Sequence, residues 1–118
     1  MKEIKSKPFF FGTKEPVYNT ADKGITRQFV GYDKNIMMVK VMFEKGAIAT
    51  QHAHIHTQTT YVTSGKYEMT IDGETKIIQA GDGFFVAPNL IHGCKCLEPG
   101  ILIDVFSPVR EDFLVTIK

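Results

Sequence analysis

Three of the four histidines in this 118-residue chain stand on alternate positions of one short segment. They are His52, His54 and His56, and the fourth, His92, follows in a second segment. Side chains two residues apart on a β-strand face the same side, so His52 and His54 can approach one ion together. Neutral imidazole is the commonest protein ligand for zinc, iron, nickel or manganese. The pattern predicts a metal site, with His56 as its neighbour because the strand is expected to bend after Ile55.

A structural role is the alternative for these histidines, since a single histidine on a strand is usually solvated or hydrogen-bonded. Their grouping favours metal binding. The histidines fall into two blocks that each begin with glycine, one from Gly46 to Gly65 and one from Gly81 to His92. A hairpin and a second strand between the blocks would bring His92 to the others.

The composition predicts one soluble globular domain. The hydrophobic content of 43% and charged content of 23% are ordinary, and the net charge of +1 argues against nucleic acid as a partner. The amino end, MKEIKSKPFFFG, has only three consecutive apolar residues, too few for a signal peptide or a membrane span. We therefore expect a cytoplasmic protein with no membrane partner.

The two cysteines, Cys94 and Cys96, are separated by one residue. Strand residues at that spacing do not readily take disulfide geometry, which predicts free thiols in a reducing compartment. On a regular strand both share the face of His92, so a thiolate ligand is one interpretation. A step of two residues moves about 6.6 Å along a strand, which favours small apolar packing instead.

Short apolar or alternating runs recur along the chain and are separated by turn residues, a rhythm typical of a β-sandwich or barrel. The dipeptide Asp72-Gly73 is the clearest hairpin turn, because both positions tolerate the positive φ of a type I′ turn. The expected strands cover residues 25–32, 36–43, 58–63, 66–71, 75–79, 84–86, 93–97 and 101–106.

The last of these strands has apolar residues on both faces. One face carries Ile101, Ile103 and Val105, and the opposite face carries Leu102, Asp104 and Phe106. A strand covered on both sides accounts for this better than one that faces water. Burial would make the lone carboxylate of Asp104 reactive; the alternative is a structural acceptor for backbone or hydroxyl donors.

A homodimer is the expected assembly, because the row of Ile101, Ile103 and Val105 would otherwise remain exposed. The run from Pro8 to Phe11 contains three successive phenylalanines. It can cover the row by folding back on its own barrel or by crossing to a second subunit. Crossing is favoured, because Cys, Met and Phe side chains already fill a small barrel and twofold dimers are the commonest closed assembly.

The first histidine block resembles the first motif of the cupins, small β-barrels that hold a metal between two motifs. That motif, Gly-x5-His-x-His-x3-(Glu or Gln)-x6-Gly, matches Gly46, His52, His54, Gln58 and Gly65 at every spacing. The resemblance implies an all-β, single-domain cupin barrel (jelly roll, or double-stranded β-helix) over residues 1–118. The amino-terminal extension and strands would cover 1–24, and the barrel core 25–107.

The second cupin motif, Gly-x5-Pro-x-Gly-x2-His-x3-Asn, matches Gly81 and His92 in spacing. Three other positions depart from it: Ala87, Asn89 and Cys96 stand where proline, glycine and asparagine are common. The metal ligand is kept, so the departures bear on the local shape of the loop.

A closer resemblance covers nearly the whole chain. The segments from Met38 to Glu74 and from Ile101 to Phe113 are similar to the KdgF-type pectin-degradation cupins. Those proteins convert the ring form of unsaturated uronates, released by pectin and alginate lyases, to linear keto sugars. The resemblance implies that His52, His54, Gln58 and His92 bind the metal and that Asp104, Phe106 and Arg110 are the remaining functional residues. The common proline after the second metal histidine is replaced by Ile55, which removes no donor.

These residues suit an anionic sugar. Three imidazoles and one glutamine carbonyl are all neutral, so a dication of nickel, zinc, manganese or iron would keep its full charge and polarise the uronate. Arg110 can clamp a carboxylate, Phe106 offers an apolar face to the ring, and Asp104 can move protons. For Arg110 the alternative is a surface salt bridge with Glu111 or Asp112.

The leading hypothesis is a metal-dependent enzyme that opens the ring of 4,5-unsaturated uronates and tautomerises the product. A metal-dependent dioxygenase is one alternative, since cupin metals with three histidines also activate dioxygen. It is disfavoured because the neutral Gln58 stabilises a higher oxidation state less than glutamate would. A non-catalytic sugar-binding module is the other alternative, and it is disfavoured because binding alone does not require four metal donors.

Overall fold

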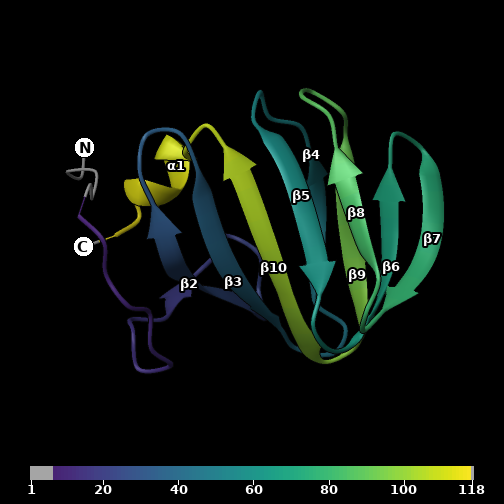
Figure 1. Cartoon of the computed structure of the whole chain (residues 1–118). Coiled ribbons are helices and arrows are strands. Elements are labelled where there is room, and N and C mark those ends of the chain that lie inside the picture. Colours follow the sequence, from purple (N-terminus) through teal and green to yellow (C-terminus); the bar gives the residue numbers. More distant parts are fainter. Residues whose placement is uncertain (1–6, 118) are drawn as a thin grey trace.

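The computed structural model describes residues 7–117 as strands with one short helix. The elements are β1 (Tyr18–Asn19), β2 (Ile25–Tyr32), β3 (Met37–Phe43), β4 (Ile48–His52), β5 (Thr57–Val62), β6 (Lys66–Ile71), β7 (Glu74–Gln79), β8 (Gly83–Val86), β9 (His92–Glu98), β10 (Gly100–Ser107) and α1 (Glu111–Leu114). Six strands form one sheet in the order β1-β2-β3-β10-β5-β8, and four form a second in the order β4-β9-β6-β7. Figure 1 shows the two sheets as facing walls, with α1 at the end of the barrel where β10 finishes. The prediction of an all-β barrel is confirmed.

All eight strands expected from the alternating pattern are present, with bounds within one residue of those predicted. The predicted turn at Asp72-Gly73 is also confirmed, since φ is 49° at Asp72 and 82° at Gly73. The expectation that one strand carries both His52 and His54 is wrong. β4 ends at His52, where its partner β9 begins at His92, and the chain then bends at residues 55–56.

The six-stranded sheet directs alternate side chains into the barrel. Asp104 of β10 lies opposite Val39 of β3 and Thr60 of β5, and both of these side chains are buried. The inner face of β10 therefore carries Leu102, Asp104 and Phe106. The outer face carries Ile101, Ile103 and Val105, which are half-buried.

Two apolar groups form the core. One fills the space between the sheets and consists of Ile25, Phe43, Ala47, Val62, Tyr67, Met69, Cys94, Cys96 and Leu102. The other joins the sheet to α1 and consists of Phe29, Met37, Val39, Phe106, Val109 and Leu114. The two cysteines are free and buried, which confirms their prediction as unpaired thiols that pack as small apolar residues.

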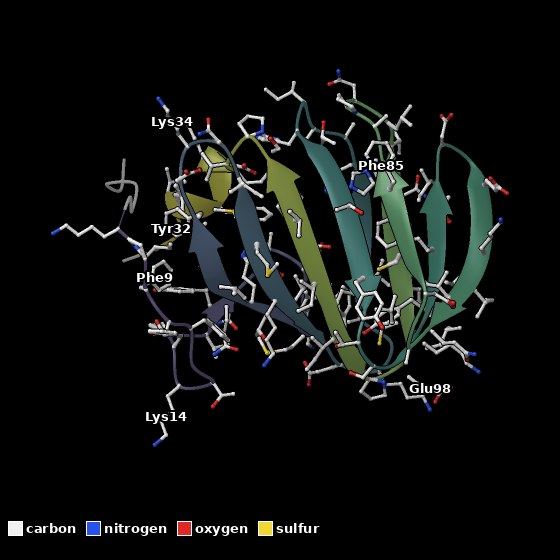
Figure 2. The ribbon with its side chains drawn as sticks, in the orientation of Figure 1. Phe9, Lys14, Tyr32, Lys34, Phe85 and Glu98 are labelled. Carbon is white, nitrogen blue, oxygen red and sulfur yellow. The ribbon has the colours of Figure 1, made fainter. Side chains whose placement is uncertain are left out.

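The amino-terminal aromatic run begins at the outer end of β2. Phe9 lies against Gly31, where an added Cβ would be 3.7 Å from its ring, and Figure 2 shows it close to Tyr32. Phe10 is 98% exposed. The division into an extension over 1–24 and a core over 25–107 stays a prediction. Across residues 7–117, no helix has the length and hydrophobicity that crossing a membrane requires.

Candidate metal centre and active site

Three histidines converge at one end of the barrel. His52 and His92 lie opposite each other in the β4–β9 ladder, with ring centroids 4.5 Å apart. His54 comes from the connection after β4, and its ring centroid is 4.9 Å from that of His92. One ligand atom from each of the three lies within 4.8 Å of the others, so the cluster can hold a metal ion. His56 lies outside this group.

The protonation of the three rings suits metal binding. Their Nδ1 atoms lie close to backbone carbonyls: His52 to Thr50 at 2.9 Å, His54 to His56 at 3.0 Å and His92 to Leu90 at 2.9 Å. A carbonyl only accepts, so each Nδ1 carries the proton and each Nε2 offers a lone pair. Nε2 of His92 is buried without a hydrogen-bond partner among the described residues, and a cation would satisfy it.

The electrostatic environment keeps two of these imidazoles neutral. Burial, followed by the nearby positive charge of Arg110, lowers the pKa of His54 to about 4. Burial also lowers the pKa of His92. A ligand histidine must be neutral to bind a metal, so both are ready to bind at neutral pH.

Gln58 supplies a fourth donor from the opposite sheet. Its Oε1 lies 3.0 Å from Nε2 of His54, and its Nε2 donates to Thr60 Oγ1 at 3.0 Å and to Asp104 Oδ1 at 3.3 Å. Those two bonds direct Oε1 toward the histidines. Because the proton of His54 is on Nδ1, the 3.0 Å contact joins two acceptors, which a shared cation would stabilise. The four residues therefore fit a divalent metal.

Asp104 lies directly behind this ligand. Its Oδ1 accepts hydrogen bonds from Thr60 Oγ1 at 2.6 Å and from Gln58, whereas Oδ2 has no hydrogen bond to a described residue. Burial raises the pKa of Asp104, against the lowering effects of Thr60, Arg110 and Gln58. A structural role as hydrogen-bond acceptor therefore accounts for Oδ1 of Asp104. Its Oδ2 is available for proton transfer.

Arg110 and Phe106 lie beside the cluster. The ring of Phe106 is 5.7 Å from that of His54, and the Arg110 guanidinium is 5.0 Å from the Phe106 centroid. Arg110 donates through Nε and Nη2 to the two oxygens of Asp112, at 2.9 and 2.7 Å. The salt-bridge alternative for Arg110 is therefore partly right, but the residue is buried, with 6% of its area exposed, and does not lie on the surface. Its Nη1–Nη2 edge remains for a second anion.

Most of the candidate residues line one cavity of about 510 Å³. Six of the residues expected at the site line it: His52, Gln58, His92, Asp104, Phe106 and Arg110. The volume lies in the range of small-molecule sites. A monosaccharide can therefore reach the metal cluster, the free carboxylate oxygen and a guanidinium at once.

Sequence reasoning missed Arg27, which also lines the cavity. Arg27 lies on the inner face of β2 and is 8% exposed. The sequence did contain a sign that Arg27 faces inward. Ile25, Arg27 and Phe29 lie on the same face of a predicted strand, and the two apolar residues indicate that this face points into the barrel. Thr60 was missed in the same way, between Gln58 and Val62 on the inner face of β5.

The cupin-domain family model matches residues 39–106. This chain is a cupin. It is 43% identical over 107 residues to the pectin degradation protein KdgF of Dickeya dadantii. The matched region covers 89% of this chain and 97% of that protein. The structure of KdgF from Halomonas sp. matches with a TM-score of 0.84 at 34% identity, over 92% of this chain and 99% of the other. The structure of an RmlC-like cupin from Shewanella frigidimarina matches with a TM-score of 0.86 at 44% identity, over 92% of this chain and 96% of the other.

The altered second motif of this cupin keeps the expected loop conformation at one position. Asn89 replaces the common glycine and has φ of 68°, a left-handed conformation that asparagine tolerates better than most residues. Its backbone N–H donates to the carbonyl of His54 at 2.7 Å. The loop of the second motif thereby supports a metal histidine of the first.

Proposed function

We propose that this cupin is a metal-dependent enzyme that opens the ring of 4,5-unsaturated uronates and tautomerises the product to linear keto sugars. The observation that carries the proposal is the half-buried carboxylate of Asp104, which contacts Gln58 inside a cavity shared with the histidine cluster and buried guanidinium groups. The similarity to two proteins named KdgF, one of them a pectin degradation protein, supports it. Unsaturated uronates are the products of pectin and alginate lyases.

The proposed ligands of one divalent ion are His52, His54, Gln58 and His92. Nickel, zinc, manganese and iron all suit a donor set of three imidazoles and an amide carbonyl. Because all four donors are neutral, the bound ion would keep its charge and act as a Lewis acid on the carboxylate or ring oxygens of the sugar.

Asp104 is the proposed acid and base. Ring opening moves the hemiacetal proton from O1, breaks the C1–O5 bond, leaves a carbonyl at C1 and returns a proton to O5 as an enol. Tautomerisation then removes the enol proton and adds one at C4, which gives a ketone at C5. The product is an isomer of the substrate, so the site only has to move protons. The Oδ2 atom of Asp104, which no described residue occupies, is suited to carry them.

Arg110 and Phe106 would hold the sugar. Arg110 adds positive charge beside the cluster, and its Nη1–Nη2 edge can still meet an anion. Phe106 supplies an aromatic surface in the cavity lining. In this arrangement the substrate lies between the metal cluster and the guanidinium groups.

The proposal extends to a homodimer in the cytoplasm. Ile103 and Val105 lie on the outer face of β10, and their ladder neighbours Tyr61 and Met38 are exposed apolar side chains. An apolar patch across neighbouring strands is a suitable surface for a second subunit.

The function can be tested with unsaturated monouronate and purified protein. We expect loss of the absorbance of its conjugated double bond to accelerate with the protein, to stop after chelation and to return when a divalent metal is added back. Activity that is indifferent to chelation would separate the metal from the chemistry. Oxygen uptake with an iron-loaded protein and a catechol-like substrate, without conversion of the uronate, would favour the dioxygenase.

A further inference from the structure

Arg27 is a buried guanidinium that forms no hydrogen bond or ion pair with residues 7–117. The side chain is 8% exposed, and its Nε is buried and unsatisfied. Burying an unpaired positive charge is costly, so such groups are normally paired. An unpaired buried arginine that lines a cavity requires an explanation.

The position of Arg27 directs it toward the site. It lies on β2 opposite Val41 of β3, on the row of side chains that faces the barrel interior. Its guanidinium carbon is 3.8 Å from the ring centroid of Phe113, so the planar group rests on an aromatic face. The stacking restricts the orientation of the guanidinium and leaves its donors unpaired. It lines the same cavity as Asp104 and His52.

None of the carboxylates around this cavity forms a hydrogen bond or ion pair with Arg27 in residues 7–117. Asp22 accepts from the backbone N and Oγ1 of Thr50, Asp104 accepts from Thr60, and Asp112 binds Arg110 through both oxygens. Burial and the positive charge of Arg110 lower the pKa of Arg27, which indicates that the surroundings do not fully compensate its charge. A carboxylate from outside the chain would supply the missing partner.

We propose that Arg27 binds the substrate carboxylate directly, through two parallel hydrogen bonds, and makes the site specific for acidic sugars. Arg110 then serves as the second positive charge, because Asp112 holds its Nε–Nη2 edge. This inference rests on the proposed function, since the carboxylate belongs to the uronate.

The experiment compares the unsaturated monouronate with its neutral methyl ester. The variant Arg27→Met keeps much of the side-chain volume and removes the charge. We expect kcat/KM for the acid to fall about 10- to 100-fold, mainly through KM, with little change for the ester. Arg27→Lys should recover part of the preference for the acid, because it restores the charge without the planar fork. Metal content should equal that of the wild type in each variant.

Lys40→Met is the matched control. Lys40 lies on the outer face of β3, opposite Gln28 of β2, so this change removes the same charge from the same sheet without touching the cavity. It should leave the preference for the acid intact.

The outcomes separate the two proposals. A wild-type protein that converts neither compound would refute the proposed function. A wild-type protein that converts the acid, with an Arg27→Met variant that keeps the wild-type preference for acid over ester, would overturn the role of Arg27. An equal loss for acid and ester would also overturn it, because that result indicates a structural role in stacking on Phe113. Should Arg27→Met fail to fold by circular dichroism, Arg27→Gln is measured in the same way.

Discussion

Neighbouring backbone carbonyls orient each of the three metal histidines. His52 and His92 each contact the carbonyl of the residue two positions earlier, and His54 contacts that of the residue two positions later. Such bonds hold the rings in place and assign the proton to Nδ1 without help from a metal. The Nε2 atom of each ring is therefore the one left to bind an ion.

Asp104 is the residue on which the proposed chemistry depends. Replacement by asparagine keeps the size of the side chain and removes its ability to carry a proton. We expect Asp104→Asn to reduce turnover of unsaturated uronate by about 10²- to 10⁴-fold, the usual contribution of a positioned acid or base. Metal content, measured by elemental analysis, should not change.

Normal turnover in Asp104→Asn would exclude this carboxylate from the mechanism. A loss of metal together with activity would show instead that Asp104 acts by orienting Gln58, to which it is hydrogen-bonded at 3.3 Å. The metal measurement therefore distinguishes proton transfer from ligand positioning.

The spacing of the donors made the histidine cluster predictable. The sequence has two histidines separated by one residue and a third in a later block that begins with glycine, and this pattern predicted a metal site. The fold forms that site from β4, β9 and the connection between β4 and β5. The pairing of Arg110 with Asp112 appeared only as an alternative, since a short spacing does not tell whether two side chains turn toward each other. Arg27 was missed because a charged residue in a strand is more often on the outer face.

At the level of elements, the eight strands expected from short apolar or alternating runs were predicted within one residue, whereas β1 and α1 were not predicted and β4 was expected to continue past His52. β4 has mostly exposed side chains, so its sequence shows no alternation of apolar and polar residues. β1 has only two residues, and α1 has four, which is too short for a helical period to be recognised. Their positions depend on tertiary contacts rather than on local pattern.

Gly65, the last glycine of the first cupin motif, lies in the turn that connects β5 of one sheet to β6 of the other. It has φ of 90°, and an added Cβ would lie 2.7 Å from the carbonyl oxygen of Glu98 and 2.9 Å from Cα of Gly100. Gly73 has φ of 82° with nothing within 4 Å. Both positions require a left-handed backbone, but only Gly65 is also crowded by backbone atoms.

We expect Gly65→Ala to lower the free energy of unfolding by about 2 kcal/mol more than Gly73→Ala does, because overpacking adds to the cost of a left-handed alanine. Urea unfolding at neutral pH measures the difference. Equal losses in the two variants would show that the backbone around Gly65 moves aside and that only the φ angle matters there.

For the whole molecule, the buried thiols predict how stability changes in alkali. Burial raises the pKa of Cys94 to about 12, whereas an unfolded cysteine has a pKa of about 8.5. Between these values the folded protein binds the proton that the unfolded chain releases. The stabilisation is therefore complete below about pH 8.5 and is lost as the pH rises toward 12.

Urea unfolding between pH 7.5 and 10 tests this. The free energy of unfolding should decline above about pH 8.5, with the buried thiol contributing at most about 1.4 kcal/mol per pH unit. Cys94→Ala should show a shallower decline, whatever its stability at pH 7.5. Parallel curves for the two proteins would contradict the prediction.

Assembly is the remaining property of the whole molecule. A lysine at position 103 would place a charge in the middle of the outer apolar row of β10. We expect Ile103→Lys to reduce the mass measured by light scattering from that of a dimer to that of a monomer, because the buried charge would lack a partner. A variant that keeps the size of the wild type would show that this row packs elsewhere or that the wild type is already a monomer.

The two rows of β10 also limit how this protein can change in length. Leu102, Asp104 and Phe106 face inward and their neighbours face outward, so one strand serves the cavity on one side and the molecular surface on the other. Inserting or deleting a single residue between Ile101 and Asp104 would exchange the two rows, because side chains alternate at every step. The carboxylate would then leave the cavity as isoleucines entered it. Side chains here can therefore be replaced one at a time, whereas an added residue keeps the carboxylate in the cavity only if a β-bulge absorbs it.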